Sequence, residues 1–330
     1  MRIGLIGAGA VADLHAMAAD RLGDTRLTAV CDLREDAAER VAGPYGAATF
    51  TDYRDLLACG AVDAVVVNTP HALHSRMVLD AAEAGLHVLV EKPMATTLED
   101  CDLMAEACAR AGVTLTVGHI QHFLPDKRAA ETAIAGGALG APVAVHDYRS
   151  TDYRPGTRSP WFFSRELAGG GALMNIGAHC LDRSVWLAGS DAVSLTAATT
   201  ERFGAPVETD GSVALGLASG ALATVSVMSD TPRKVDELTV VCERGTVVAD
   251  PRAGTFVRVD GRTRQVHTPR PSDIPDAFYA QLADFAAVVG GAVPRVSLAH
   301  GRHVVEMVLA AYASATAGGP VAVGAARQSV

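Results

Sequence analysis

The sequence predicts an α/β fold: a doubly wound parallel sheet at the N-terminus, followed by an α+β domain with an open, mostly antiparallel sheet. The first part of the chain alternates short apolar runs with helical patterns. The second part is rich in strands that are separated by turn signals. A length of 330 residues also favours two domains, which we expect at 1–120 and 121–330.

The parallel sheet is predicted from short runs that are nearly continuous in apolar residues. Strands have this composition when helices cover both faces of a sheet. The expected strands are Ile3–Ile6, Leu27–Cys31, Ala64–Val67, His87–Val90 and Thr114–Val117. The expected helices between them are Val11–Leu22, Arg34–Val41, Ser75–Ala84 and Leu98–Ala111. This alternation is typical of a doubly wound sheet.

Residues 121–330 have a strand-rich pattern in which glycine-containing turns separate several strands, as antiparallel hairpins require. The expected strands are Val143–Asp147, Ala192–Thr200, Ser212–Leu217, Ala221–Val227, Leu238–Cys242 and Thr255–Val259. The expected helices are Lys127–Ile134, Ala172–Leu187, Asp276–Val289 and Ala299–Ala315. We therefore expect an open sheet with helices on one face.

The composition excludes several classes of protein. With 49% hydrophobic and 20% charged residues the chain is not disordered, and it contains no run of roughly 20 apolar residues that would span a membrane. A net charge of −9 without charge blocks disfavours nucleic acids and anionic membranes as partners. Its six cysteines form no CxxC pair, which disfavours a disulfide framework and a zinc site. The first residues form a strand and no signal peptide, so we expect a cytoplasmic protein.

A glycine loop follows the first predicted strand. The segment Gly7-Ala8-Gly9-Ala10-Val11-Ala12 matches the pattern G-x-G-x-x-G/A, in which glycines let the backbone approach a pyrophosphate at a helix N-terminus. Asp32 ends the second strand, where a carboxylate accepts hydrogen bonds from ribose hydroxyls and repels a 2′-phosphate. These features predict a Rossmann domain that binds NAD. Arg34 could neutralise a 2′-phosphate or lie on the surface, so NADP is not excluded.

Three further segments carry a family resemblance. They are Val90-Glu91-Lys92-Pro93, Asn68-Thr69-Pro70-His71 with His74, and the run from Gly169-Gly170-Gly171 through Asn175-Ile176-Gly177-Ala178-His179. The lysine follows a strand end, on the side of the sheet where ligands bind, and the chain contains only three lysines. Together with the glycine loop, these segments resemble the Gfo/Idh/MocA family (glucose–fructose oxidoreductase and inositol dehydrogenase) of NAD(P)-dependent oxidoreductases.

The resemblance covers essentially the whole chain and implies an active site between a Rossmann domain and an open sheet. In the family pattern, Thr69, Pro70 and His74 line the nicotinamide side, and Glu91 anchors the cofactor ribose. Lys92 contacts the reacting hydroxyl.

The catalytic pair implied by the resemblance is also chemically reasonable. Oxidation of a secondary alcohol needs a base, for which His179 has a suitable titration range, and an ammonium such as Lys92 stabilises the developing alkoxide. Asn175 lies four residues before His179, so both can face one side of a helix. The family usually has aspartate at the position of Asn175. An asparagine can orient a histidine but carries no charge, which leaves open whether Lys92 carries more of the proton transfer.

The other candidate substrate contacts have structural alternatives that the sequence leaves open. These candidates are His119, His122, Trp161-Phe162-Phe163, Tyr153, Arg154 and Arg158. His300 and His303 have helical spacing but no acidic third ligand, so we expect no metal site.

The sequence thus predicts an NAD-dependent dehydrogenase acting on a secondary hydroxyl of a sugar, an amino sugar or a cyclitol. One alternative is an NADP-linked reductase of a keto-sugar or another carbonyl or imine. The other is a dinucleotide-binding sensor without catalysis. The expected partners are a small polyhydroxylated substrate and further copies of the chain, because the resemblance implies a homodimer or homotetramer that packs through the open sheet.

Overall fold

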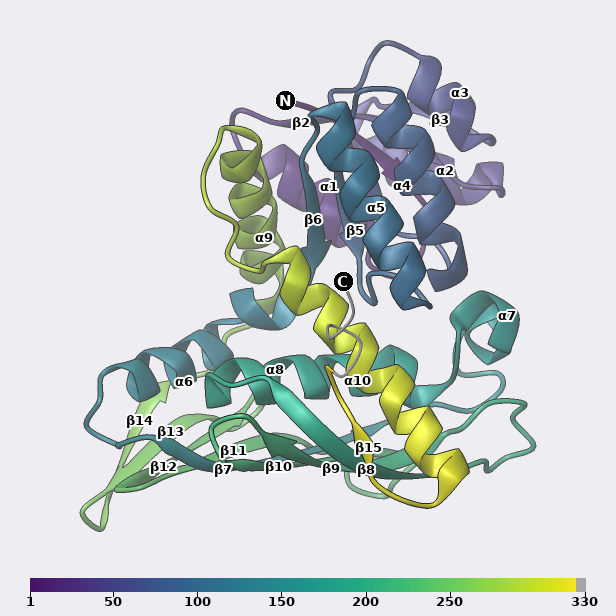
Figure 1. Ribbon diagram of the computed structural model, residues 1–330. Coiled ribbons are helices and arrows are strands. Elements are labelled where there is room, and N and C mark those ends of the chain that lie inside the picture. Colours follow the sequence, from purple (N-terminus) through teal and green to yellow (C-terminus); the bar gives the residue numbers. More distant parts are fainter. Residues whose placement is uncertain (325–330) are drawn as a thin grey trace. The chain divides into compact units, whose positions relative to one another are not determined.

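The computed structural model describes residues 1–324, which form two compact units (Figure 1). Unit 1 comprises Met1–Phe123 and Ser272–Arg302. Unit 2 comprises Leu124–Pro271 and the described residues from His303 onward. The expected boundary at residue 120 lies close to the first division. The segment 272–302, however, belongs to unit 1, whereas the sequence predicts it in the second domain.

The helix α9 (Asp273–Val289) explains this difference. Its apolar face carries Phe278, Leu282 and Phe285, and all three are buried in the hydrophobic core that contains Ile3 and Leu5. An amphipathic helix joins whichever core buries its apolar stripe, and its place in the sequence does not decide which one.

Unit 1 contains a parallel sheet, which in the described chain has six strands in the order β3-β2-β1-β4-β5-β6. The strands are β1 (Arg2–Ile6), β2 (Arg26–Cys31), β3 (Ala48–Phe50), β4 (Ala64–Val67), β5 (His87–Glu91) and β6 (Leu115–Gly118). The order reverses between β1 and β4, and ligands of such sheets bind beyond the strand ends at this switch point.

The helices of unit 1 are α1 (Ala12–Arg21), α2 (Glu35–Ala42), α3 (Tyr53–Ala58), α4 (His74–Glu83), α5 (Leu98–Ala111) and α9. Short 3₁₀ turns are η1 (Gly43–Tyr45), η2 (His71–Leu73) and η3 (Ile120–Phe123). The sequence did not predict β3 and α3, because segments of three and six residues are too short to show a hydrophobic period.

Unit 2 contains the open sheet, whose nine strands within residues 1–324 have the order β14-β13-β12-β11-β7-β10-β9-β8-β15. They are β7 (Pro142–Thr151), β8 (Ala192–Thr200), β9 (Asp210–Leu217), β10 (Leu222–Ser229), β11 (Asp236–Cys242), β12 (Gly245–Asp250), β13 (Gly254–Val259), β14 (Arg262–His267) and β15 (Val321–Ala322). Neighbouring strands are antiparallel except for the parallel pair β7 and β10. The predicted open, mostly antiparallel sheet is therefore confirmed.

Helices cover one face of this sheet (Figure 1). They are α6 (Pro125–Ala135), α8 (Ala178–Ala188) and the part of α10 (Leu298–Ala317) that begins at His303. The shorter turns are η4 (Pro160–Phe163), α7 (Arg165–Ala168) and η5 (Leu173–Gly177), a π-helical turn directly before α8. Among residues 1–324, no helix has both the length and the apolar composition needed to cross a membrane.

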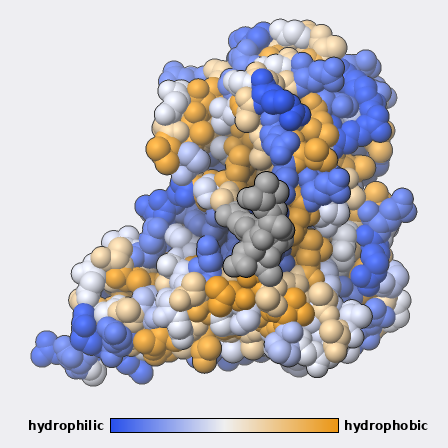
Figure 2. All heavy atoms as spheres, in the orientation of Figure 1, coloured by the Kyte–Doolittle hydropathy of each residue, from blue (hydrophilic) through white to orange (hydrophobic). Residues whose placement is uncertain are grey.

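The hairpin of β13 and β14 ends one side of the open sheet. Its tip is hydrophilic on the face that Figure 2 shows, and β14 carries the exposed side chains of Arg262 and Arg264. Charges on an edge strand prevent unwanted pairing with other strands.

A buried ion cluster attaches α8 to the sheet. The guanidinium of Arg183 donates to Asp147 on β7 at 2.6 and 2.7 Å and to Asp236 on β11 at 2.6 Å. Arg183 and Asp147 have fully buried side chains. Burial alone would raise the pKa of Asp236, but the charges of Arg183 and its neighbours hold that pKa well below its usual value. The cluster therefore fixes both the height and the rotation of α8 on the sheet.

We expect Arg183→Met to lower the free energy of unfolding by about 3–5 kcal/mol, because it leaves buried carboxylates without their partner. Denaturant unfolding followed by circular dichroism measures this loss. The matched control is Arg110→Met, which removes an exposed arginine 3.5 Å from Glu106 and should change stability by less than about 1 kcal/mol. Equal losses in the two variants would contradict the assignment.

Candidate active site

The glycine loop has the geometry of a phosphate-binding turn. Gly7 has φ of +102°, and a Cβ there would lie 2.3 Å from the carbonyl oxygen of Asn68, so only glycine fits. At Gly9 the added Cβ would meet no described atom within 4 Å. Val11 is the N-cap of α1, and within residues 1–324 its side chain makes no capping hydrogen bond. The first amides of α1 therefore lie next to the open space at Gly9, and a pyrophosphate can bind to them there.

Asp32 is held against this loop by main-chain amides. Its Oδ2 accepts a hydrogen bond from the Ala8 amide at 2.9 Å, and its Oδ1 accepts one from the Arg34 amide at 3.0 Å. The Arg34 guanidinium is 71% exposed and lies 4.0 Å from Oδ1. A carboxylate has lone pairs for further donors, so Asp32 can still accept ribose hydroxyls.

His74 connects two loop segments of unit 1 through its imidazole ring. The ring is fully buried, with Nδ1 3.0 Å from the Pro93 carbonyl oxygen and Nε2 3.0 Å from the Thr69 carbonyl oxygen. Burial lowers the pKa of His74, and a neutral imidazole donates from one nitrogen at a time. This arrangement ties the segment of Thr69 and Pro70 to the segment after Lys92. The expected place of His74 beside the nicotinamide stays a prediction.

The carboxylate of Glu91 also contacts groups of unit 1. Its Oε1 lies 2.9 Å from Nε2 of His15 on α1, and its Oε2 accepts a hydrogen bond from the Lys92 amide at 3.2 Å. A Cβ at Gly118 on the neighbouring strand would lie 2.9 Å from Oε1, so glycine makes room for the carboxylate. Burial by itself would raise the pKa of Glu91, but the hydrogen bond and charge of His15, with the nearby Lys92, lower it. Glu91 thus fixes the backbone at Lys92.

The sequence analysis did not identify His15. Its side chain is 1% exposed and packs edge-on against Phe278, with ring centroids 4.9 Å apart. The available signal was a histidine on a helix face that otherwise buries alanines such as Ala12, Ala16 and Ala19. Its partner lies 76 residues away in sequence, so spacing alone could not reveal the pair.

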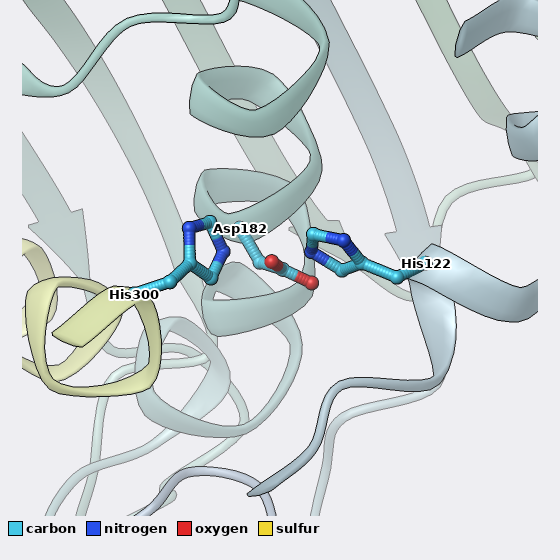
Figure 3. Close-up of side chains that lie close together, drawn as sticks. All are labelled: His122, Asp182 and His300. Carbon is cyan, nitrogen blue, oxygen red and sulfur yellow. The ribbon is translucent and has the colours of Figure 1, made fainter. Parts of the chain in front are cut away.

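Histidines gather beyond the end of β6. The ring centroid of His300 lies 5.7 Å from that of His119 and 5.0 Å from that of His122. Because Glu91 pairs with Gly118, Lys92 and His119 leave adjacent parallel strands at the same edge. Figure 3 shows His122 and His300, and it also labels Asp182, which is fully buried on α8 of unit 2. The expected absence of a metal stays a prediction.

In unit 2 the glycine run leads into the helix that carries Asn175 and His179. The predicted helix Ala172–Leu187 is present, but it begins with the π turn Leu173–Gly177. Asn175 lies in this turn and is 5% exposed, whereas His179 is partly exposed in the first turn of α8. A π turn contains an extra residue, so the assumed α-helical relation of the two side chains is changed. Such turns occur frequently at functional sites.

An aromatic group lies before the glycine run. Trp161 stacks on Phe162 with ring centroids 3.7 Å apart, and both are partly exposed within the structure. Tyr153 is fully buried, and its hydroxyl donates to the Phe162 carbonyl at 2.8 Å. Arg158 lies over the Tyr153 ring at 5.1 Å. Burial therefore favours a structural role for Tyr153, whereas Trp161 keeps a surface that a ligand can contact.

We expect Glu91→Gln to reduce the free energy of unfolding at pH 7 by about 1–3 kcal/mol, because it weakens a charge-assisted hydrogen bond. The lowered pKa of Glu91 means that its contribution is present above the unfolded pKa and is lost as the pH falls. Unfolding measured from pH 7 down to about pH 3 should therefore show the difference from wild type disappearing. Glu83→Gln, at an exposed residue of α4, is the control. A difference that is constant with pH would contradict the lowered pKa of Glu91.

Comparison with known proteins agrees with this geometry. Residues 1–119 match the oxidoreductase family with an NAD-binding Rossmann fold, and residues 128–248 match the Gfo/Idh/MocA C-terminal domain. The chain is 31% identical over 264 residues to the inositol 2-dehydrogenase of Rubrobacter xylanophilus, covering 78% of this chain and 73% of that protein. It is 30% identical to the D-xylose 1-dehydrogenase (NADP(+)) 2 of Haloferax volcanii, covering 97% and 99%.

A solved structure has the same fold. GenD2 from gentamicin A biosynthesis, in complex with NAD, is 27% identical, with a TM-score of 0.88 and coverage of 98% of this chain and 97% of that one. The two matched domains together span most of the described chain. The chain therefore belongs to the Gfo/Idh/MocA family of oxidoreductases, and unit 1 contains the NAD-binding Rossmann fold of that family.

Proposed function

We propose that this protein is an NAD-dependent dehydrogenase that oxidises a secondary hydroxyl of a sugar, an amino sugar or a cyclitol to a ketone. The observation that carries the proposal is the position of Lys92, which follows β5 in the dinucleotide-binding unit and has its backbone fixed by Glu91. Relatives named as inositol and xylose dehydrogenases support the substrate class.

The residues of the chain would handle the proton of this reaction. The bound nicotinamide ring supplies the acceptor for the hydride that leaves the alcohol carbon. His179 takes the hydroxyl proton, and the Lys92 ammonium stabilises the developing alkoxide. Asn175 orients His179 without adding a charge. His122 and Trp161 are proposed substrate contacts, and Thr69 and Pro70 the nicotinamide contacts.

The choice of NAD follows from Asp32. A 2′-phosphate beside this carboxylate would bring like charges together, and the amide hydrogen bonds from Ala8 and Arg34 keep the carboxylate in place. The Arg34 side chain lies mostly in solvent. The NADP label of the Haloferax relative shows that the cofactor varies among similar proteins.

We expect Lys92→Ala and His179→Ala each to lower kcat by about 10²- to 10⁴-fold, the usual contribution of acid–base catalysis. NADH formation with a panel of sugars, amino sugars and cyclitols measures this loss. Lys234→Ala, which removes a partly exposed lysine that pairs with Asp152, should retain wild-type turnover. Unchanged turnover in both site variants would refute the assignment. NAD binding without turnover of any alcohol would favour the sensor alternative.

We also propose a homodimer or homotetramer that is formed through the open face of the sheet in unit 2. This face exposes the apolar side chains of Tyr148 on β7 and Leu222 on β10. The edge strand β14 of this sheet carries the exposed charged side chains of Arg262 and Arg264.

We expect sedimentation to give a multiple of the 34.1-kDa chain mass, and Leu222→Glu to shift it toward the monomer, because Leu222 is 62% exposed on this face. Val293→Glu changes an even more exposed apolar residue of unit 1 and should leave the mass unchanged. A monomeric wild-type protein would contradict the proposal.

We further propose a cytoplasmic location. The six cysteines, all in the described part of the chain, are free thiols. Burial raises the pKa of Cys31 and of Cys101 to about 12, so these thiols are inert in a reducing compartment.

A further inference from the structure

The start of the helix that carries Asn175 and His179 has an unusual set of partners. The first amides of a helix lack partners inside the helix and need hydrogen bonds from elsewhere. The first intrahelical bond here is donated by the Asn175 amide to the Gly171 carbonyl at 3.0 Å. The amides of residues 171–174 therefore depend on other groups.

Two residues accept all of these hydrogen bonds. Oε1 of Glu208, in the loop before β9, accepts the amides of Gly171 at 2.8 Å and Leu173 at 3.1 Å. The backbone carbonyl of Glu208 accepts the Ala172 amide at 2.9 Å. The hydroxyl of Tyr312 on α10 accepts the Met174 amide at 3.1 Å and donates to Oε1 of Glu208 at 2.7 Å.

This arrangement also explains the glycine run. A Cβ at Gly170 would lie 2.0 Å from the Tyr312 hydroxyl oxygen, and one at Gly171 would lie 2.0 Å from the Glu208 carbonyl oxygen. The two acceptors thus occupy the space in which ordinary side chains would begin. The glycines are required by the approach of Glu208 and Tyr312.

We infer that Glu208 and Tyr312 are positioning residues for Asn175 and His179. They fix the start of the helix, while Arg183 fixes it to the sheet one turn after His179. The π turn lies between these two attachments and absorbs the extra residue. The direction of the Asn175 and His179 side chains then depends on both attachments. This role rests on the proposed function, since it concerns the proposed base.

The charge of Glu208 suits this role. A carboxylate at a helix N-terminus interacts favourably with the helix dipole and makes stronger hydrogen bonds to amides than a neutral acceptor does. Burial raises the pKa of Glu208, and the hydrogen bonds from Tyr312 and the amides oppose that rise. Tyr312 and Tyr153 are titratable groups near this carboxylate, and burial raises the pKa of both.

The test compares Tyr312→Phe with Ser314→Ala in the full-length protein. Ser314 lies on the same helix, is fully buried, and its hydroxyl accepts the Ala197 amide at 2.9 Å, away from the glycine run. Each variant removes one buried hydroxyl, and each leaves one backbone amide without its hydrogen-bond acceptor. We expect Tyr312→Phe to lower kcat about 10- to 100-fold, with KM changed less than kcat, because it displaces a catalytic group. Ser314→Ala should lower the unfolding temperature and retain kcat.

Two further measurements separate positioning from general stability. We expect Glu208→Gln combined with Tyr312→Phe to reduce kcat by less than the product of the single effects, because the two residues share one network. In protein labelled with ¹⁵N-histidine, the His179 signals (assigned with His179→Gln) should shift in Tyr312→Phe and stay in place in Ser314→Ala.

The inference is overturned if Tyr312→Phe leaves both kcat and the His179 signals unchanged, or if Ser314→Ala changes them equally. It is also overturned if the effects of Glu208→Gln and Tyr312→Phe on kcat simply multiply. If wild-type protein oxidises none of the tested alcohols, the proposed function fails. The NMR comparison still decides the positioning role in that case.

Discussion

Hydrogen bonds from main-chain amides to carboxylates organise each segment that carries the candidate site. Asp32 accepts the Ala8 amide of the glycine loop, Glu91 accepts the amide of Lys92, and Glu208 accepts the amides of the glycine run. An amide points where the backbone points, so each bond fixes a short stretch of chain as well as one atom. Bonds of this kind are stronger than neutral ones, because the acceptor carries a full charge. The functional side chains then extend from a backbone that has little freedom.

The same bonds explain where the chain tolerates buried charge. Moving a lone carboxylate out of water is unfavourable, and amides and a cation compensate for this only when their geometry is good. Glu91 has His15 and the Lys92 amide, and its pKa is lowered. Glu208 accepts hydrogen bonds from amides and from the Tyr312 phenol, and burial raises its pKa. The two carboxylates are therefore stabilised differently: the contact with His15 and the nearby Lys92 lower the pKa of Glu91, whereas Glu208 accepts hydrogen bonds from amides and from Tyr312.

Local signals in the sequence predicted the elements and motifs well. The helix α5 has its predicted bounds, and the loop Gly7–Ala12 is followed by a helix as expected. The partners of the site residues were beyond such reasoning. His15 and Glu91 are 76 residues apart, and Met174 and Tyr312 are 138 residues apart. Hydrophobic period and motif spacing describe neighbours along the chain, whereas these pairs exist only after the sheets have formed. The location of α9 in unit 1 was missed for the same reason.

Asn175 shows how packing changes the meaning of a motif. Read from the sequence, it replaces a carboxylate at a familiar distance from His179. In the structure it is nearly buried in a π turn, a few residues after amides that already converge on the carboxylate of Glu208. A second carboxylate at Asn175 would add a buried charge to a segment whose amides already bind the buried carboxylate of Glu208. A neutral amide can orient a histidine without that desolvation penalty. Because Asn175 carries no charge, we propose that other groups stabilise the proton on His179 in the proposed reaction, and that Lys92 is one of them.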